Sequence, residues 1–130
     1  MVMHRIHQLA TDWGVSSKDI IDRLKRAHRI GVTLVFGTDT VKNLEGKNKP
    51  GMMLDYLAVW QAAGIPAADT LKAMTTNAAR LLRIEKKRGA VAAGFAADLI
   101  ATPANPLDDI QALRRVIFVM KDGKVIRHDK

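Results

Sequence analysis

The chain contains no cysteine among its 130 residues, so disulfide bonds and metal sites built from thiolates are excluded. A reducing compartment agrees with that absence. The sequence also lacks an apolar run long enough to cross a membrane, and residues 1–10 lack the apolar core of a secretory signal. We therefore expect a cytoplasmic protein with no membrane partner.

Aromatic residues are scarce, at 5% of the chain, and none alternates with the basic clusters as a base-stacking surface would. The net charge of +8 raises the question of nucleic-acid binding. The basic residues, however, are spread over three short segments at 23–29, 86–88 and 114–115. Because binding to a phosphate backbone depends on a concentrated basic patch, we expect a solvated basic surface and no nucleic-acid partner.

What the chain does contain is enough apolar material for a core, at 48% hydrophobic residues. Ser16 and Asp19 are typical of a helix start, and the helix is predicted to run to about Arg29. The apolar run Val32 to Phe36 is bounded by glycines. It predicts a strand buried on both faces, as in a parallel sheet.

Two more helices are predicted, from about Met52 to Ala63 and from Pro66 to about Leu82, with Gly64 ending the first. From Gly89 onward the pattern changes to short apolar stretches, with a strand predicted at 98–101. A hairpin is predicted around Asp122-Gly123. We therefore divide the chain into a helix–strand–helix part, 1–88, and a β part, 89–130.

Asp39 is the carboxylate that follows the predicted strand, in the sequence Gly37-Thr38-Asp39. Functional side chains collect beyond the carboxyl ends of strands in parallel sheets. A carboxylate there can bind a metal and take a proton from water. The simpler alternative is that Asp39 only forms a turn. The residues alone leave both interpretations open.

Four motifs occur in a fixed order: G-T-D at the end of an apolar strand, T-x-N-A-A, G-x-x-x-x-G-x-x-A-D-L and K-D-G-K. In this order and spacing the chain resembles the C-terminal part of metal-dependent amidohydrolases. It is most similar to the imidazolonepropionase-like and Xaa-Pro dipeptidase-like members. The resemblance implies an α/β fold class: the C-terminal end of a (β/α)8 metallo-hydrolase barrel plus part of a small composite β-sandwich.

The resemblance also implies a site. Asp39 would lie beside the metal centre at the end of the last barrel strand, as catalytic proton shuttle and metal ligand. The implied cofactor is zinc or another divalent metal. The implied reaction is hydrolysis of an amide, cyclic amide or peptide C–N bond in a small-molecule or peptide substrate. Thr76 and Asn77 would belong to a structural helix, and Asp98 to a turn.

The sequence departs from the family pattern in two ways. Arg83 and Ala93 replace a glycine and a proline, which are changes in surface loops. More importantly, the family's H-x-H pair, its carboxylated lysine and two further histidines have no match. His4 and His7 are spaced for one face of a helix instead. Because a catalytic zinc takes about three protein ligands, we expect the isolated chain to be weakly active or inactive. A missing barrel portion or self-association would have to complete it.

One alternative comes from another class of protein. Residues 9–27, LATDWGVSSKDIIDRLKRA, have the cadence of a helix–turn–helix. A non-catalytic interaction module or nucleic-acid-binding module that uses this basic N-terminal segment is therefore the alternative function.

Overall fold

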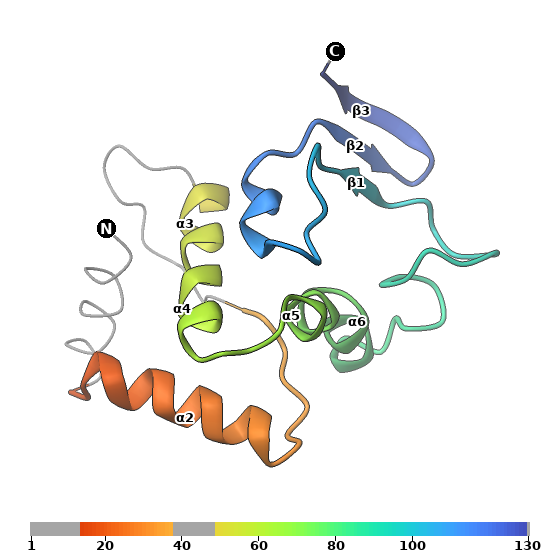
Figure 1. Cartoon of the computed structure of the whole chain (residues 1–130). Coiled ribbons are helices and arrows are strands. Elements are labelled where there is room, and N and C mark those ends of the chain that lie inside the picture. The colour runs from red at the N-terminus through yellow and green to blue at the C-terminus, as the bar shows by residue number, and fades with distance from the viewer. Residues whose placement is uncertain (1–13, 38–48, 130) are drawn as a thin grey trace.

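The computed structural model of the chain describes residues 14–37 and 49–129 (Figure 1). His4, His7 and Asp39 lie outside the described residues. The described chain is α/β, with helices in its first part and a small antiparallel sheet at its end. The helices are α2 (Ser17–Arg29), α3 (Lys49–Asp55), α4 (Leu57–Ala62), α5 (Ala67–Met74), α6 (Thr76–Leu81) and the 3₁₀ helix η1 (Ile110–Arg114). The strands are β1 (Leu99–Ala101), β2 (Phe118–Lys121) and β3 (Lys124–His128).

The boundaries of α2 follow directly from local sequence. The Ser16 hydroxyl accepts the Asp19 N–H at 3.0 Å, and the Asp19 carboxylate accepts the Ser16 N–H at 3.0 Å, which closes a capping box. At the other end Gly31 has φ +79°, and the Gly31 and Val32 N–H groups donate back to the carbonyls of His28 and Ala27. This is a Schellman ending. The predicted helix is confirmed.

Residues 32–37 are extended but form no strand, so the predicted strand from Val32 to Phe36 is wrong for the described chain. A strand needs a neighbour, and none of the described elements provides one. The segment is held by helices instead: the Phe36 N–H donates to the Ala73 carbonyl at 3.1 Å. The Asn77 side chain donates to the Leu34 carbonyl at 2.9 Å. Val32 is 50% exposed, which also contradicts burial on both faces.

The predicted helix from Met52 to Ala63 is two helices, α3 and α4, which are interrupted at Tyr56. Arg114 of η1 explains why the interruption is stable. Its guanidinium donates to the Leu54 carbonyl at 3.0 Å and pairs with the Asp55 carboxylate at 3.0 Å. Gly64, with φ +71°, follows the end of α4 as predicted.

The predicted helix from Pro66 to Leu82 is also divided, into α5 and α6, at Thr75. The Thr75 hydroxyl donates to the Leu71 carbonyl at 2.7 Å and the Thr76 hydroxyl to the Lys72 carbonyl at 3.5 Å. Hydroxyl bonds of this i to i−4 kind bend helices. The interruption at Thr75 leaves the Ala73 carbonyl available to Phe36, so it couples the helices to the extended segment.

The end of α6 carries a strained residue. Arg83 has φ +59°, and the Arg83 and Ile84 N–H groups donate to the carbonyls of Arg80 and Ala79. This is a Schellman ending in which arginine takes the position that glycine usually occupies. An L-residue in this left-handed conformation costs about 1–2 kcal/mol.

We therefore expect Arg83→Gly to stabilise the chain by about 0.5–1 kcal/mol, because glycine relieves the strain but gives the unfolded chain more freedom. Urea unfolding of the two proteins measures the difference. The control is Arg83→Ala, which removes the charge but keeps the Cβ atom and should gain nothing. An equal gain in both variants would mean that charge, and not backbone strain, is responsible.

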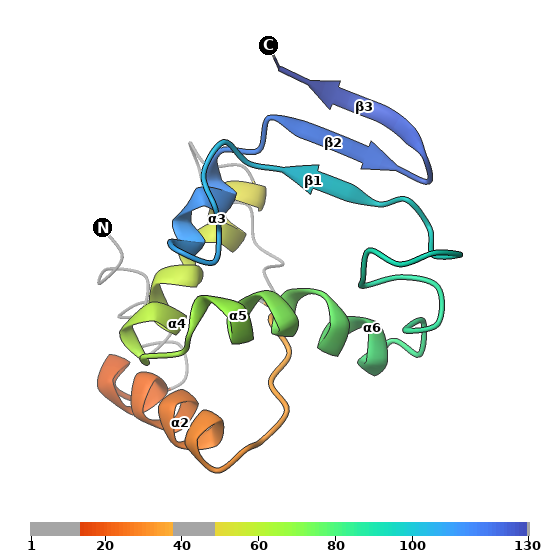
Figure 2. The same ribbon diagram turned by 45° about the vertical axis from the view of Figure 1, so that its right-hand side comes forward.

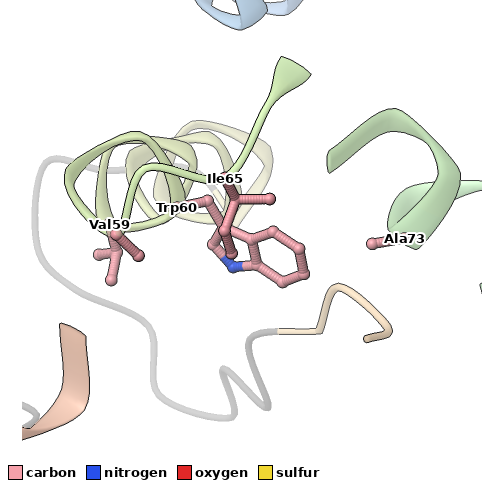
Figure 3. Packing of buried hydrophobic residues seen from close by; sticks show 5 residues of the cluster. Val59, Trp60, Ile65 and Ala73 are labelled. Carbon is pink, nitrogen blue, oxygen red and sulfur yellow. The ribbon is translucent and has the colours of Figure 1, made fainter. Parts of the chain in front are cut away.

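Two clusters of buried side chains form the core. The first contains Val59, Trp60, Ala63, Ile65 and Ala73 (Figure 3). The second contains Leu57, Ile110 and Leu113. Phe36 packs against both clusters, and its ring lies 5.4 Å from that of Trp60 at an angle of 52°. The residue that precedes Gly37 is thus fixed at the junction of the two clusters.

The sheet has the order β1-β2-β3 and is antiparallel throughout (Figure 2). Asp122 and Gly123, with φ +48° and +79°, connect β2 to β3 in the type I′ geometry that this dipeptide favours. The predicted hairpin is confirmed, as is the predicted strand that contains Leu99 to Ala101. Asp98 ties the turn to the preceding chain: its carboxylate pairs with Arg88, accepts Lys121 at 3.0 Å and accepts the Asp122 N–H at 2.9 Å. Asp98 is therefore a structural turn residue.

Candidate functional site

The backbone that leads to Asp39 is positioned by α4 and α5. Phe36 is anchored through its N–H to Ala73 and through its ring to Trp60. Gly37 follows, exposed, and is the last described residue before the carboxylate. No side chain or backbone contact of Asp39 is described, so its role as catalytic residue and metal ligand stays a prediction.

At the other end of the extended segment the structure has a polar cavity of about 210 Å³. Its lining includes His28 from α2, Asp69 and Lys72 from α5, and the buried Trp60. His28 Nε2 lies 3.0 Å from Asp69 Oδ2, and Lys72 Nζ lies 2.9 Å from Asp69 Oδ1. The hydrogen bond to His28, followed by that to Lys72, lowers the pKa of Asp69 below its usual 3.8. This cluster joins α2 to α5.

No signal in the sequence predicted this contact, because His28 and Asp69 are 41 positions apart and lie in separate helices. Hydrogen-bonded pairs of this kind also occur as ordinary surface links between helices. The contact lies on α2 and α5, at the opposite end of the segment from Gly37, so it does not add a group to the carboxylate at Asp39.

We expect the Asp69 contacts to make stability depend on acid. Because the folded pKa is lower than the unfolded value of 3.8, their contribution is complete above that value and is lost as the pH falls through the folded pKa. Asp69→Asn should therefore destabilise the chain at about pH 5 and have much less effect at about pH 2.5. Both groups are more than a third exposed, so the effect is small. Urea unfolding at both pH values measures it.

The control for this experiment is Asp108→Asn, which changes an exposed carboxyl that has no ion pair among the described residues. It should cost the same at both pH values. A loss for Asp69→Asn that does not depend on pH would contradict an electrostatic origin.

The described residues do not fit a metal centre. Within 14–37 and 49–129, no three His, Asp or Glu side chains gather closely enough to hold an ion. A catalytic zinc takes about three protein ligands. The described part of the chain therefore lacks the ligands of such a site, and Asp39 is the one candidate that the sequence adds. In the same described part, no helix is long and apolar enough to span a membrane.

Comparison with known proteins identifies the fold. A family model described as "Amidohydrolase family" matches residues 1–126. Among solved structures, a Xaa-Pro dipeptidase with bound methionine in its active site is 29% identical over 97% of the chain, with a TM-score of 0.78. Molinate hydrolase is 26% identical over 79% of the chain, with a TM-score of 0.67. A prolidase complexed with N-methylphosphonate-L-proline shares the fold, at 23% identity over 84% of the chain and a TM-score of 0.63.

The chain spans only part of these relatives: 33% of the Xaa-Pro dipeptidase, 25% of molinate hydrolase and 26% of the prolidase. No curated protein matches it. The family match covers nearly the whole chain and agrees with the order of its four motifs, so the chain belongs to the amidohydrolase family.

Proposed function

We propose that the chain forms the C-terminal third of a metal-dependent hydrolase that cleaves an amide, cyclic amide or peptide C–N bond. The observation that carries the proposal is the structural match to a Xaa-Pro dipeptidase, which includes 97% of this chain but 33% of the relative. A chain placed almost entirely within a protein three times its length is suited to part of a catalytic domain. The substrate is a small molecule or a peptide.

Asp39 is the catalytic residue in this proposal. It takes a proton from the attacking water and delivers it to the leaving nitrogen, and it contributes one ligand to a divalent metal, for which zinc is the first candidate. The support is its position two residues beyond Gly37, where Phe36 fixes the preceding backbone between two core clusters.

Residues 1–88 belong to the barrel in this proposal, and 89–130 belong to a composite β-sandwich. The remaining ligands come from further polypeptide or from a second copy, in the cytoplasm. The nucleic-acid alternative gains no support from α2, because Ile21 and Leu24 pack their side chains against the first core cluster. That packing makes α2 part of the fold, and not a separate recognition element.

The test uses the chain alone and a chimera in which it replaces the matching third of the Xaa-Pro dipeptidase. The chain alone should bind no stoichiometric zinc and hydrolyse no Xaa-Pro dipeptide, because most ligands are missing. The chimera should bind zinc and hydrolyse the dipeptides. Circular dichroism and metal analysis come first, to show that the chimera is folded and loaded. A folded, loaded chimera without turnover would contradict the proposal, and zinc-dependent turnover by the chain alone would contradict its incompleteness.

A further inference from the structure

The extended segment Gly31–Gly37 has two backbone edges, and only one of them is satisfied. Leu34 accepts the Asn77 side chain and Phe36 donates to Ala73, so residues 34 and 36 face the helices. Successive residues of an extended chain direct their N–H and C=O groups to opposite sides. The groups of Thr33 and Val35 therefore face away from α5 and α6. Among the described residues, none forms a hydrogen bond with the backbone of Thr33 or Val35.

This open edge has the composition of a strand that pairs. Its residues Val32 to Phe36 are β-branched, aliphatic or aromatic, and no charged residue occurs between Arg29 and Asp39. Thr33 is exposed, and no strand of the described chain runs beside the segment, which is drawn in orange in Figures 1 and 2. Unpaired, uncharged edges of this kind recruit another strand.

The edges of the sheet are different. β3 carries Lys124, Arg127 and His128, so two copies of it would bring like charges together. β1 has three residues and is followed closely by Pro103, which leaves little backbone to pair. Charge and short length both protect an edge from association. The segment Gly31–Gly37 has neither protection.

We propose that this edge pairs with the same edge of a second copy of the chain, in antiparallel orientation about a two-fold axis at Leu34. Thr33 of one copy then lies opposite Val35 of the other, and each such pair exchanges both backbone hydrogen bonds. A two-fold arrangement closes after two copies, because the same edge is used on both. The pairing uses the groups that the described chain leaves unbonded.

A second copy fits this edge because the segment is uncharged although each chain has a net charge of +8. At about 3.3 Å per extended residue, Arg29 lies about 10 Å or more from Leu34, beyond the Debye length of about 8 Å at physiological ionic strength. Repulsion between the copies is therefore screened near the axis. Salt should strengthen this dimer, whereas it would weaken one built on ion pairs.

The pairing bears on the catalytic proposal but does not depend on it. Thr38 and Asp39 follow the segment directly, so the second copy steadies the backbone that precedes the carboxylate. Assembly is measured without any substrate or metal. A monomeric chain would overturn the dimer and leave the proposed hydrolase untouched, and an inactive chimera would do the reverse.

Sedimentation velocity of the full chain tests the proposal, with a mass of 14.3 kDa for the monomer and twice that for the dimer. Thr33→Lys places two like charges close to the axis on a side chain that is exposed, so it should weaken dimerisation at least about tenfold without unfolding the chain. The matched control is Ile126→Lys in β3, where Ile126 is 61% exposed, and it should leave the dimer unchanged. A chain that stays monomeric up to about 1 mM, or a dimer that Ile126→Lys disrupts and Thr33→Lys does not, would overturn the proposal.

Amide hydrogen exchange gives a second readout at single residues. Exchange of the Thr33 and Val35 N–H groups should slow about tenfold or more when the protein concentration favours the dimer. Exchange of the Phe36 N–H, which is bonded to Ala73 within one chain, should change little. Equal rates for Thr33 and Val35 in monomer and dimer would show that the copies meet elsewhere.

Discussion

Gly89→Ala is expected to lower the free energy of unfolding by about 2–5 kcal/mol. Gly89 has φ +92°, where an L-residue costs about 1–2 kcal/mol. The added Cβ atom would also lie 2.6 Å from the Ala79 Cβ atom and 3.1 Å from the Thr75 carbonyl oxygen. Ala79 is 4% exposed, and Thr75 presents backbone, so neither neighbour can move away easily. Overpacking of this kind adds about 1–3 kcal/mol.

The matched control is Gly94→Ala. Gly94 has nearly the same backbone conformation, φ +82°, but its added Cβ atom would meet nothing within 4 Å. It should therefore cost only the conformational part, about 1–2 kcal/mol. Urea unfolding with an unchanged m value measures both variants. Equal losses would mean that contact with α6 contributes nothing, and that the chain can rearrange around position 89.

Asp39→Asn is expected to lower kcat/KM of the chimera with the Xaa-Pro dipeptidase by about 10²–10⁴-fold, the usual range for a lost acid–base group. Asparagine keeps the size of the side chain but cannot accept the proton of the attacking water. Zinc content separates the two proposed roles. A loaded but inactive variant indicates proton transfer, and a variant that has lost zinc indicates ligation.

The control for position 39 is Asp98→Asn. Asp98 is the other aspartate of the family motifs, and its carboxylate is occupied by Arg88, Lys121 and the Asp122 N–H. Its loss should reduce stability and leave kcat/KM of the folded chimera within about threefold of the parent, because surface ion pairs contribute little to catalysis at a distance. Comparable loss of activity in both variants would assign no special role to Asp39.

Features fixed by neighbouring residues were predictable from the sequence. Ser16 and Asp19 are three positions apart and close the capping box of α2. Asp122 and Gly123 are adjacent and determine the hairpin turn. The helix and turn signals succeeded at these places because every partner in the interaction lies within one turn of the chain.

Features fixed by distant residues were not predictable. The interruption at Tyr56 depends on Arg114, whose guanidinium reaches the Leu54 carbonyl across 60 positions. The apolar run at Val32 has the composition of a strand, but a strand exists only where a neighbour supplies hydrogen bonds, and the described neighbours are helices. The candidate site has the same origin: motif order identifies Asp39, while the other metal ligands have no match in the sequence.

The interruption at Thr75 gives the chain a conflict between local and tertiary preference. A continuous helix across 67–81 would satisfy the Ala73 carbonyl internally and would then have no acceptor to offer Phe36. Substitutions that raise helix propensity at Thr75 or Thr76 should make a better isolated peptide helix and a worse scaffold. The two threonines therefore set the position of Phe36, and a search for stabilising mutations guided by helix propensity alone would select against it.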